Sequence, residues 1–246
     1  LRDGDGYQVL MELLSTDPDT IGSFMSAPVE IETEAIYPID YYGSAMSPFY
    51  SVLAIWVGSL ILVAIIHVGV KPLPGVGKVK AAESYVGRYL TFFLIGQAQA
   101  LLTVLGDLYY VGIQCLHPFK FWLAASMASF VFTLLIYSLT VAFGNIGEAL
   151  AVVIMVIQVA GAGGTFPVQT LPQIYQDIYK FLPFPYAMDA MRECVAGMYD
   201  HYYWECIGKL ALYIPVSVVI GLICGKPFVK MNERIEENKE DSGVMV

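Results

Sequence analysis

Few residues in this sequence have the types and spacing that catalysis or cofactor binding needs. Gly75-Val76-Gly77-Lys78 comes nearest to a phosphate-binding loop, but a P-loop needs glycine at position 72 and serine or threonine at position 79. Proline and valine stand there instead, and no Gly-x-Ser-x-Gly or His-Glu-x-x-His motif occurs. The three histidines are scattered along the chain. We therefore expect no enzyme and no resident metal or cofactor.

The cysteines are a second possible source of chemistry. The chain has four, and two of them, Cys194 and Cys206, lie close together in sequence. A disulfide between these two would brace the segment that holds them. The alternative is a pair of free thiols packed among apolar side chains. The sequence leaves both interpretations open.

Composition shows what kind of elements must hold these residues. Of the 246 residues, 57% are hydrophobic and 14% are charged, whereas a soluble domain carries about 25% charged residues. This excludes a disordered chain and a small disulfide scaffold, and argues against an ordinary cytosolic enzyme. The net charge of −9 disfavours nucleic acid binding, which needs a basic face.

The apolar residues form five long blocks. Residues 49–70 and 121–143 contain no Asp, Glu, Lys or Arg, and the other three blocks carry one or two such residues each. About 20 apolar residues cross the ~30 Å hydrocarbon core of a bilayer. We therefore expect an all-α polytopic membrane protein with a membrane domain over residues 49–230. Its expected spans are 49–70, 89–111, 121–143, 146–164 and 207–229.

Basic residues near the ends of the spans predict the orientation, because they gather on the cytoplasmic side. One side has eight: Lys71, Lys78, Lys80, Arg88, Lys226, Lys230, Arg234 and Lys239. The other side has four: Lys120, Lys180, Arg192 and Lys209. We therefore expect a plasma-membrane protein whose tail, 231–246, is cytoplasmic and whose segment 1–48 is extracellular. Since the sequence starts at Leu1, we also expect an upstream signal or a further, sixth span.

The expected outer segment, 165–206, is strongly patterned. Apolar residues recur at helical spacing over 170–182 and again over 186–199, with prolines between the two stretches. We expect two amphipathic helices that lie on or dip into the outer leaflet, and a plain soluble loop is the alternative. Asp189 and Arg192 are three residues apart and can pair.

Polar residues inside the expected spans are the remaining candidates. Asp107 is an intramembrane charge, a kind of residue that is costly and often functional. Its place beside two tyrosines near the outer end of its span favours simple contact with interfacial water. Gln97, Gln99 and Gln158 are expected to form hydrogen bonds between helices.

Two sets of motifs carry a resemblance to a known family. The run from Pro38 to Tyr50, PIDYYGSAMSPFY, with LAIWVG after it, resembles the entry to the membrane domain of the phage infection protein (Pip) family. A second set is similar to the outer re-entrant hairpin of ABC type 2 exporter permeases, to which that domain is related. Its residues are Gly163, Gly164, Pro167, Pro172, Pro183, Pro185 and Arg192.

The resemblance implies a function and partners. In members of the family, a large extracellular domain follows a first span that lies far upstream. Residues 1–48 would be the juxtamembrane end of that domain. Exporter permeases work as homodimers or in larger complexes, and a separate ATPase grips a short cytoplasmic helix. Residues 71–88 form the one sizeable inner connection, so Lys78, Lys80 and Arg88 either face that ATPase or serve only as orientation signals. No catalytic residue comes with the resemblance.

The function implied is therefore export or secretion across the plasma membrane. Family members have been tied to phage adsorption and DNA entry in Gram-positive bacteria, and relatives occur beside a secretion system. The alternative is a membrane-anchored phage receptor or secretion-system scaffold without transport activity, in which phage contacts the extracellular domain.

Overall fold

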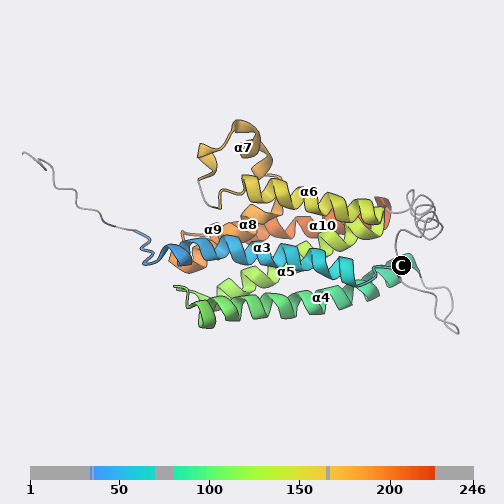
Figure 1. The fold of residues 1–246 in the computed structure, drawn as a ribbon, viewed down its shortest axis with the longest axis horizontal. Helices are drawn as coiled ribbons and strands as arrows, with labels where there is room; N and C mark the ends of the chain where they lie inside the picture. Colours follow the sequence, from blue (N-terminus) through green and yellow to red (C-terminus); the bar gives the residue numbers. More distant parts are fainter. Residues whose placement is uncertain (1–33, 35, 70–79, 165–166, 225–246) are drawn as a thin grey trace, which may run out of the picture. The chain divides into compact units, whose positions relative to one another are not determined.

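The fold is known from a computed structural model that describes residues 34, 36–69, 80–164 and 167–224. The chain divides into two compact units, Leu1–Ile36 and Tyr37–Val246. The expected tail, 231–246, and Lys78 lie outside the described residues. Within the described part of the second unit, all regular secondary structure is helical (Figure 1).

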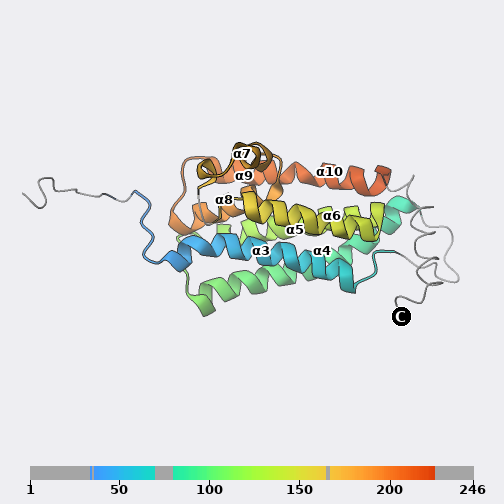
Figure 2. The same ribbon diagram turned by 45° about the horizontal axis from the view of Figure 1, so that its top comes forward.

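The long helices of this unit run side by side (Figures 1 and 2). In chain order the elements are α3 (Tyr42–Ile65), α4 (Ala81–Leu105), η1 (Gly106–Val111), α5 (Pro118–Phe143), α6 (Asn145–Gly161), η2 (Val168–Thr170), α7 (Gln173–Tyr179), α8 (Pro183–Ala196), α9 (Tyr202–Ala211), α10 (Tyr213–Val219) and η3 (Ile220–Cys224). Here η1 and η3 are π-helical extensions of α4 and α10, and η2 is a 3₁₀ turn.

Four stretches of helix are long and apolar enough to cross a membrane. They are Tyr42–Ile65, Ala81–Val111, Pro118–Phe143 and Tyr202–Ile223. A fifth apolar helix, Asn145–Gly161, has 17 residues, which at 1.5 Å per residue gives about 25 Å. The expected all-α polytopic membrane fold is confirmed, with α6 as its shortest long helix.

Helix α5 lies at the centre of the unit. It contacts α3, α4, α6, α8, α9 and α10, and in both ribbon views it lies between α4 and the layer of α6 and α8 (Figures 1 and 2). Its small residues Ala124, Ala125 and Ala128 are fully buried, and small side chains let neighbouring helices approach closely. Most of α5 is buried against other helices, and a helix covered in this way needs no polar stripe, in keeping with the absence of charged residues from 121–143.

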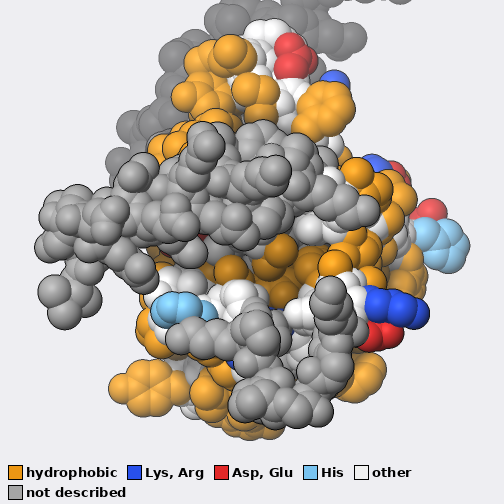
Figure 3. All heavy atoms as spheres, turned by 90° about the vertical axis from the view of Figure 1, so that its right-hand side faces the viewer, with side chains coloured by type: hydrophobic (Ala, Val, Ile, Leu, Met, Phe, Trp, Pro, Cys, Tyr) orange, Lys and Arg blue, Asp and Glu red, His pale blue; other side chains and the backbone are white. Residues whose placement is uncertain are grey.

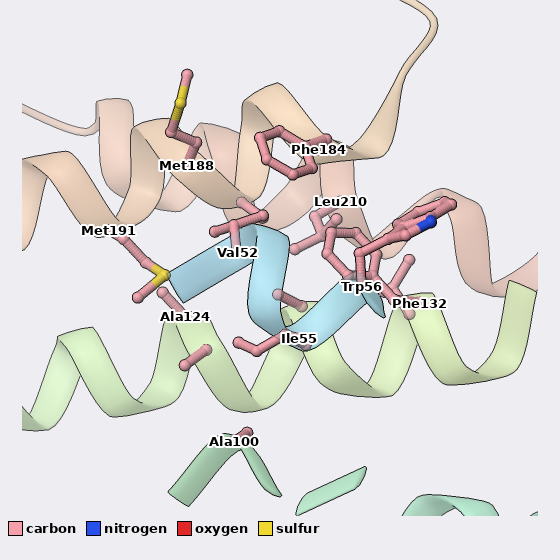
Figure 4. Close-up of a cluster of buried hydrophobic side chains, with 14 of the residues drawn as sticks. Val52, Ile55, Trp56, Ala100, Ala124, Phe132, Phe184, Met188, Met191 and Leu210 are labelled. Atoms are coloured by element: carbon pink, nitrogen blue, oxygen red, sulfur yellow. The ribbon is translucent and has the colours of Figure 1, made fainter. Parts of the chain in front are cut away.

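The core joins α3, α5 and α8. In Figure 4, Val52 and Trp56 of α3 lie between Phe132 of α5 and the α8 side chains Phe184 and Met188. The rings of Trp56 and Phe132 meet edge to face, with centroids 4.8 Å apart. The apolar face of α8 is therefore buried against other helices. Helical periodicity predicts such an apolar face without distinguishing lipid from protein as its neighbour.

Helix α3 begins at Tyr42, before the start of the span expected from residue 49, and Pro48 lies within it. Proline cannot donate the helical hydrogen bond to the carbonyl four residues earlier, which here belongs to Ser44. The Ser47 hydroxyl donates to that Ser44 oxygen at 3.1 Å instead. A neighbouring side chain thus satisfies the carbonyl, and the helix continues through the proline.

The turn between α5 and α6 needs glycine at two positions. Gly144 separates the helices with a φ of 59°, a region that side chains with a Cβ rarely adopt. At Gly147 an added Cβ would overlap the Leu139 carbonyl group. The two backbones therefore touch where the chain reverses.

The sides of the unit expose large apolar side chains. Figure 3 views the end where α4 begins, and the described side chains there are mainly hydrophobic, with few charged groups among them. Exposed apolar residues of α4 are Val86, Leu90, Leu94, Leu101 and Leu102. Large apolar side chains exposed along a long helix in this way are suited to contact with lipid.

Candidate functional site

The motif residues of the expected outer hairpin meet around one charged pair, Asp189 and Arg192. Both come from α8, and their side chains are 3.4 Å apart, with exposed fractions of 14% and 36%. The predicted pairing at three-residue spacing is confirmed. We use the name hairpin site for this pair together with Gly163, Gly164, Tyr179 and Tyr202.

Arg192 holds the end of α6 to α8. Its Nη2 donates to the carbonyl oxygens of Gly163 at 3.2 Å and Gly164 at 3.0 Å. Those carbonyls follow the last turn of α6, where helical partners run out. Gly163 adopts a φ of 63°, and a Cβ at Gly164 would overlap the Phe49 ring of α3. The two glycines therefore allow a turn and a close contact that other residues would block.

Asp189 accepts hydrogen bonds from two tyrosines that sequence analysis did not identify. Tyr179 of α7 donates to its Oδ2 at 2.9 Å, and Tyr202 of α9 donates to the same oxygen at 3.2 Å. Burial and the Asp189 carboxylate raise the pKa of Tyr179 above its usual value, so its hydroxyl stays a donor. One carboxylate thus links α7, α8 and α9.

The prolines of the hairpin motif lie at helix starts around this site. Pro167 precedes η2, Pro172 precedes α7, and Pro183 is the first residue of α8. These are positions where the missing proline N–H costs no helical bond. Pro185 is buried within the first turn of α8. The prolines therefore shape the hairpin, and of the motif residues Gly163, Gly164 and Arg192 meet directly.

A cavity of about 680 Å³ opens beside the hairpin site. Asp189, Arg192, Tyr179 and Tyr202 line it together with backbone at Gly163 and Gly164. Apolar parts of its wall come from Ile39 just before α3, from Met46 and Pro48 near the start of α3, and from Val195 of α8. The site therefore combines fixed polar groups with an apolar wall, as small-molecule sites commonly do.

A second cluster lies near the start of α4. The Tyr85 hydroxyl shares a hydrogen bond of 2.7 Å with Ser138 of α5, and the Tyr137 hydroxyl donates to the Tyr85 carbonyl at 3.1 Å. On its other side, Tyr85 lies against η3, where a Cβ on Gly221 would come within 2.5 Å of its ring. Tyr85 is buried, so this cluster fixes the start of α4 to two other helices.

The basic residues expected to face an ATPase differ in the structure. Lys80 is exposed just before α4, and its backbone N–H donates a hydrogen bond to the Glu83 carboxylate at 3.3 Å. Arg88 lies within α4, where its Nε donates to the His67 carbonyl at 2.7 Å and its guanidinium lies 6.0 Å from the Phe92 ring centre. Arg88 therefore ties α4 to the chain just after α3. Residues 81–88 of the expected inner connection form the first part of α4.

Asp107 lies in η1 and is half-buried rather than freely solvated. The Ser51 hydroxyl of α3 donates to its carboxylate, and its backbone oxygen accepts from Ile113 at 3.1 Å. The π-helical turn thus places Asp107 where it fastens the end of α4 to α3. The sequence showed the charge but not its partner, which is 56 residues away along the chain.

The intramembrane glutamines form hydrogen bonds between helices, as predicted. Gln97 donates to the Ser126 carbonyl at 3.0 Å, and Gln99 donates to the Ala54 carbonyl at 3.1 Å. The Gln158 side-chain oxygen accepts the backbone N–H of Phe184 at 3.1 Å. These contacts join α4 to α5, α4 to α3, and α6 to α8.

Cys194 and Cys206 are free thiols rather than a disulfide. Cys194 and Cys206 are both free and buried, so the structure decides between the two alternatives. Burial raises the pKa of the Cys194 thiol to about 12, which keeps it protonated. Among the described residues, no three His, Cys, Asp or Glu side chains are grouped so as to hold a metal ion.

Comparison with known proteins identifies the family of this chain. Residues 18–224 match the profile of a family described as "ABC-2 family transporter protein". The chain belongs to the ABC-2 transporter family. This family membership and the long apolar helices make the chain a multi-pass membrane protein. The resemblance to the Pip membrane domain and to type 2 exporter permeases is confirmed.

One similar ABC-2 relative is much longer than this chain. A Bacillus subtilis (strain 168) protein named "Uncharacterized protein YhgE" is 26% identical over 228 residues, which make up 93% of this chain and 28% of that protein. The chain therefore corresponds to little more than a quarter of that relative. No solved structure shows a match.

Proposed function

We propose that this chain is the membrane domain of an export permease driven by a separate ATPase. The ATPase docks where α4 begins, on residues 71–88, and transport proceeds toward the hairpin end. Membership of the ABC-2 family supports the class of function. The observation that carries the coupling is the continuity of α4 with η1 from Ala81 to Val111, 31 residues without a break.

A continuous helix gives a mechanical route across the membrane. At about 1.5 Å per residue, Ala81–Val111 is some 45 Å long, so it extends beyond the hydrocarbon core. Tyr85 anchors its first turns to α5 and η3, and Asp107 anchors its last turn to α3 through Ser51. A force on the start of α4 is therefore passed to α5 at one end and to α3 at the other.

The basic residues divide into two roles in this proposal. Lys80 is exposed and contacts acidic groups of the ATPase, as does Lys78, which lies outside the described residues. Arg88 is already bonded to the His67 carbonyl, so it positions the connection instead of contacting the partner. The excess of Lys and Arg at this end also supports a cytoplasmic location for it.

Co-purification tests the proposal. The full-length protein is tagged in its own host, crosslinked and purified from membranes, and any co-purifying ATPase is quantified. Lys80→Glu is expected to lower the amount of ATPase about tenfold, because a like-charge contact replaces an attractive one. Lys180→Glu is the matched control, since it makes the same change at an exposed lysine near α7.

Two results would contradict parts of this proposal. If purified protein carries no ATPase and shows no ATP-dependent movement of any compound in proteoliposomes, the transport proposal is wrong. The membrane domain would then serve as an anchor for a larger extracellular part. Equal recovery of an ATPase with Lys80→Glu and wild type would contradict the docking role given to Lys80.

A further inference from the structure

We infer that the cavity beside Arg192 binds an anionic amphiphile, with its phosphate group on Arg192 and its hydrocarbon chain along the start of α3. The inference requires only that the chain lies in a membrane. It stands whether or not an ATPase drives transport.

The first step is the donor capacity left on Arg192. A guanidinium has five N–H donors. Within the described residues Arg192 donates three hydrogen bonds, one to Asp189 and two to the carbonyls of Gly163 and Gly164. The side chain keeps an exposed fraction of 36% and lines the cavity. Arg192 is therefore held in place from behind while part of its fork remains open to a ligand.

The second step is that Asp189 does not compete for a cation. Its two oxygens accept from Tyr179, Tyr202 and Arg192, and its side chain is only 14% exposed. A carboxylate that is already bonded by three donors offers little to an ammonium group. The free hydrogen-bonding capacity of the charged pair is thus on the cationic side, which favours phosphate, the group that arginine binds with its fork.

The third step is the apolar wall opposite the charged pair. Ile39 lines the cavity from just before α3, Met46 and Pro48 line it from near the start of α3, and Val195 lines it from α8. A volume of about 680 Å³ is in the range of sites that hold molecules of drug size. It accommodates a phosphate head together with the first part of a hydrocarbon chain, whereas a free phosphate would leave the apolar wall uncovered.

The fourth step is the depth of the cavity in the membrane. Its lining includes Tyr42 and Tyr202, the first residues of two candidate spans. Exposed aromatic residues surround this end, namely Tyr41, Tyr42, Tyr199 and Trp204. Such residues concentrate at the level of the lipid headgroups. The cavity therefore opens where phosphate groups of amphiphiles are found.

Native mass spectrometry of the full-length protein tests this inference. Protein in mild detergent is titrated with phosphatidylglycerol or with phosphatidylcholine of the same chain length, and the bound lipid is counted. Wild type is expected to retain phosphatidylglycerol about tenfold better than phosphatidylcholine, and Arg192→Gln is expected to remove that preference. Lys180 lies at the same end of the unit but does not line the cavity. Lys180→Gln is therefore expected to keep the preference for phosphatidylglycerol.

A second variant avoids any effect of Arg192 on folding. Ala45 lines the cavity without contacting the charged pair. Ala45→Trp therefore fills the cavity and leaves the hydrogen bonds of Asp189 and Arg192 intact. It is expected to lower phosphatidylglycerol retention about tenfold. Ile61→Trp, on an exposed part of the same helix, is the control and is expected to bind as wild type does.

Three results would overturn the inference. Equal retention of the two lipids by wild type would remove the anion preference. Unchanged retention in Ala45→Trp would place the lipid elsewhere. Displacement of the lipid by millimolar inorganic phosphate would show that the head alone accounts for binding, whereas failure of phosphate to compete supports an amphiphile.

Discussion

Where α4 begins, Tyr85 is bonded to Ser138 inside a closed aromatic cluster, whereas at the hairpin site Asp189 and Arg192 border an open cavity. In the first region the neutral hydroxyls and rings of Tyr85, Tyr137 and Ser138 are buried and pack against one another. The second uses charge, tyrosine donors and backbone carbonyls, and keeps part of its hydrogen-bonding capacity open. One end is thus built to transmit a displacement, and the other to admit a molecule.

The largest effect is expected where backbones touch at the end of the unit near the start of α4. Gly147→Ala would force a Cβ into the Leu139 carbonyl group, and backbone cannot move aside as a side chain can. We expect a loss of about 3 kcal/mol or more, measured as lost monodisperse protein in detergent. Gly87→Ala is the control, because nothing lies within 4 Å of that position. Similar yields for the two variants would show that this turn is not closely packed.

The next effect concerns the closed cluster. Tyr85→Phe removes the hydroxyl that bonds Ser138 in a buried place. A buried hydrogen bond of this kind contributes about 1–2 kcal/mol once the unsatisfied partner is included. The midpoint of unfolding in mixed detergent and sodium dodecyl sulfate gives the measurement. No shift in the midpoint would contradict a mechanical role for this contact.

A smaller effect is expected from the equivalent change at the hairpin site. Tyr179→Phe removes one donor from Asp189, but Tyr202 and Arg192 still bond that carboxylate. The expected loss is about 0.5–1 kcal/mol by the same measurement. If Tyr179→Phe proved more destabilising than Tyr85→Phe, the contrast between a closed and an adaptable end would be reversed.

The smallest effect is a pH dependence at Cys115, in the turn before α5. Burial raises the pKa of this thiol above its ordinary value of 9.0, so the folded protein holds the proton more tightly than the unfolded chain does. The resulting stabilisation is present below pH 9 and is lost as pH rises beyond it. Maleimide labelling of the folded protein is therefore expected to stay slow until the pH exceeds 9, whereas detergent-unfolded protein labels earlier. Equal pH profiles would contradict this.

The sequence predicts the helices better than it predicts their ends. Residues 121–143 form an uncharged apolar run of membrane-spanning length, most of which is buried in α5, so length and composition suffice to find this helix. The start of α3 was missed because Pro48 resembles a helix boundary, and only the Ser47 hydroxyl explains why the helix passes through it. Local spacing also predicted the pair of Asp189 and Arg192.

Contacts between distant segments could not be predicted in this way. Tyr179 and Tyr202 reach Asp189 from two other helices, and no spacing rule links them. Arg88 is a basic residue in the inner connection and was therefore a candidate for binding a partner. In the structure its guanidinium instead donates to the His67 carbonyl. The burial of α8 is a third example, since an amphipathic pattern shows an apolar face without showing whether protein or lipid covers it.

Vectorial labelling tests most directly whether the two contrasting ends lie on opposite sides of the membrane. Single cysteines are introduced as Lys80→Cys and His117→Cys, both at exposed positions, in full-length protein whose native cysteines are replaced. With a membrane-impermeant maleimide on intact cells, His117→Cys is expected to react at once and Lys80→Cys only after permeabilisation. Reaction of both positions in intact cells, or of Lys80→Cys alone, would contradict the account.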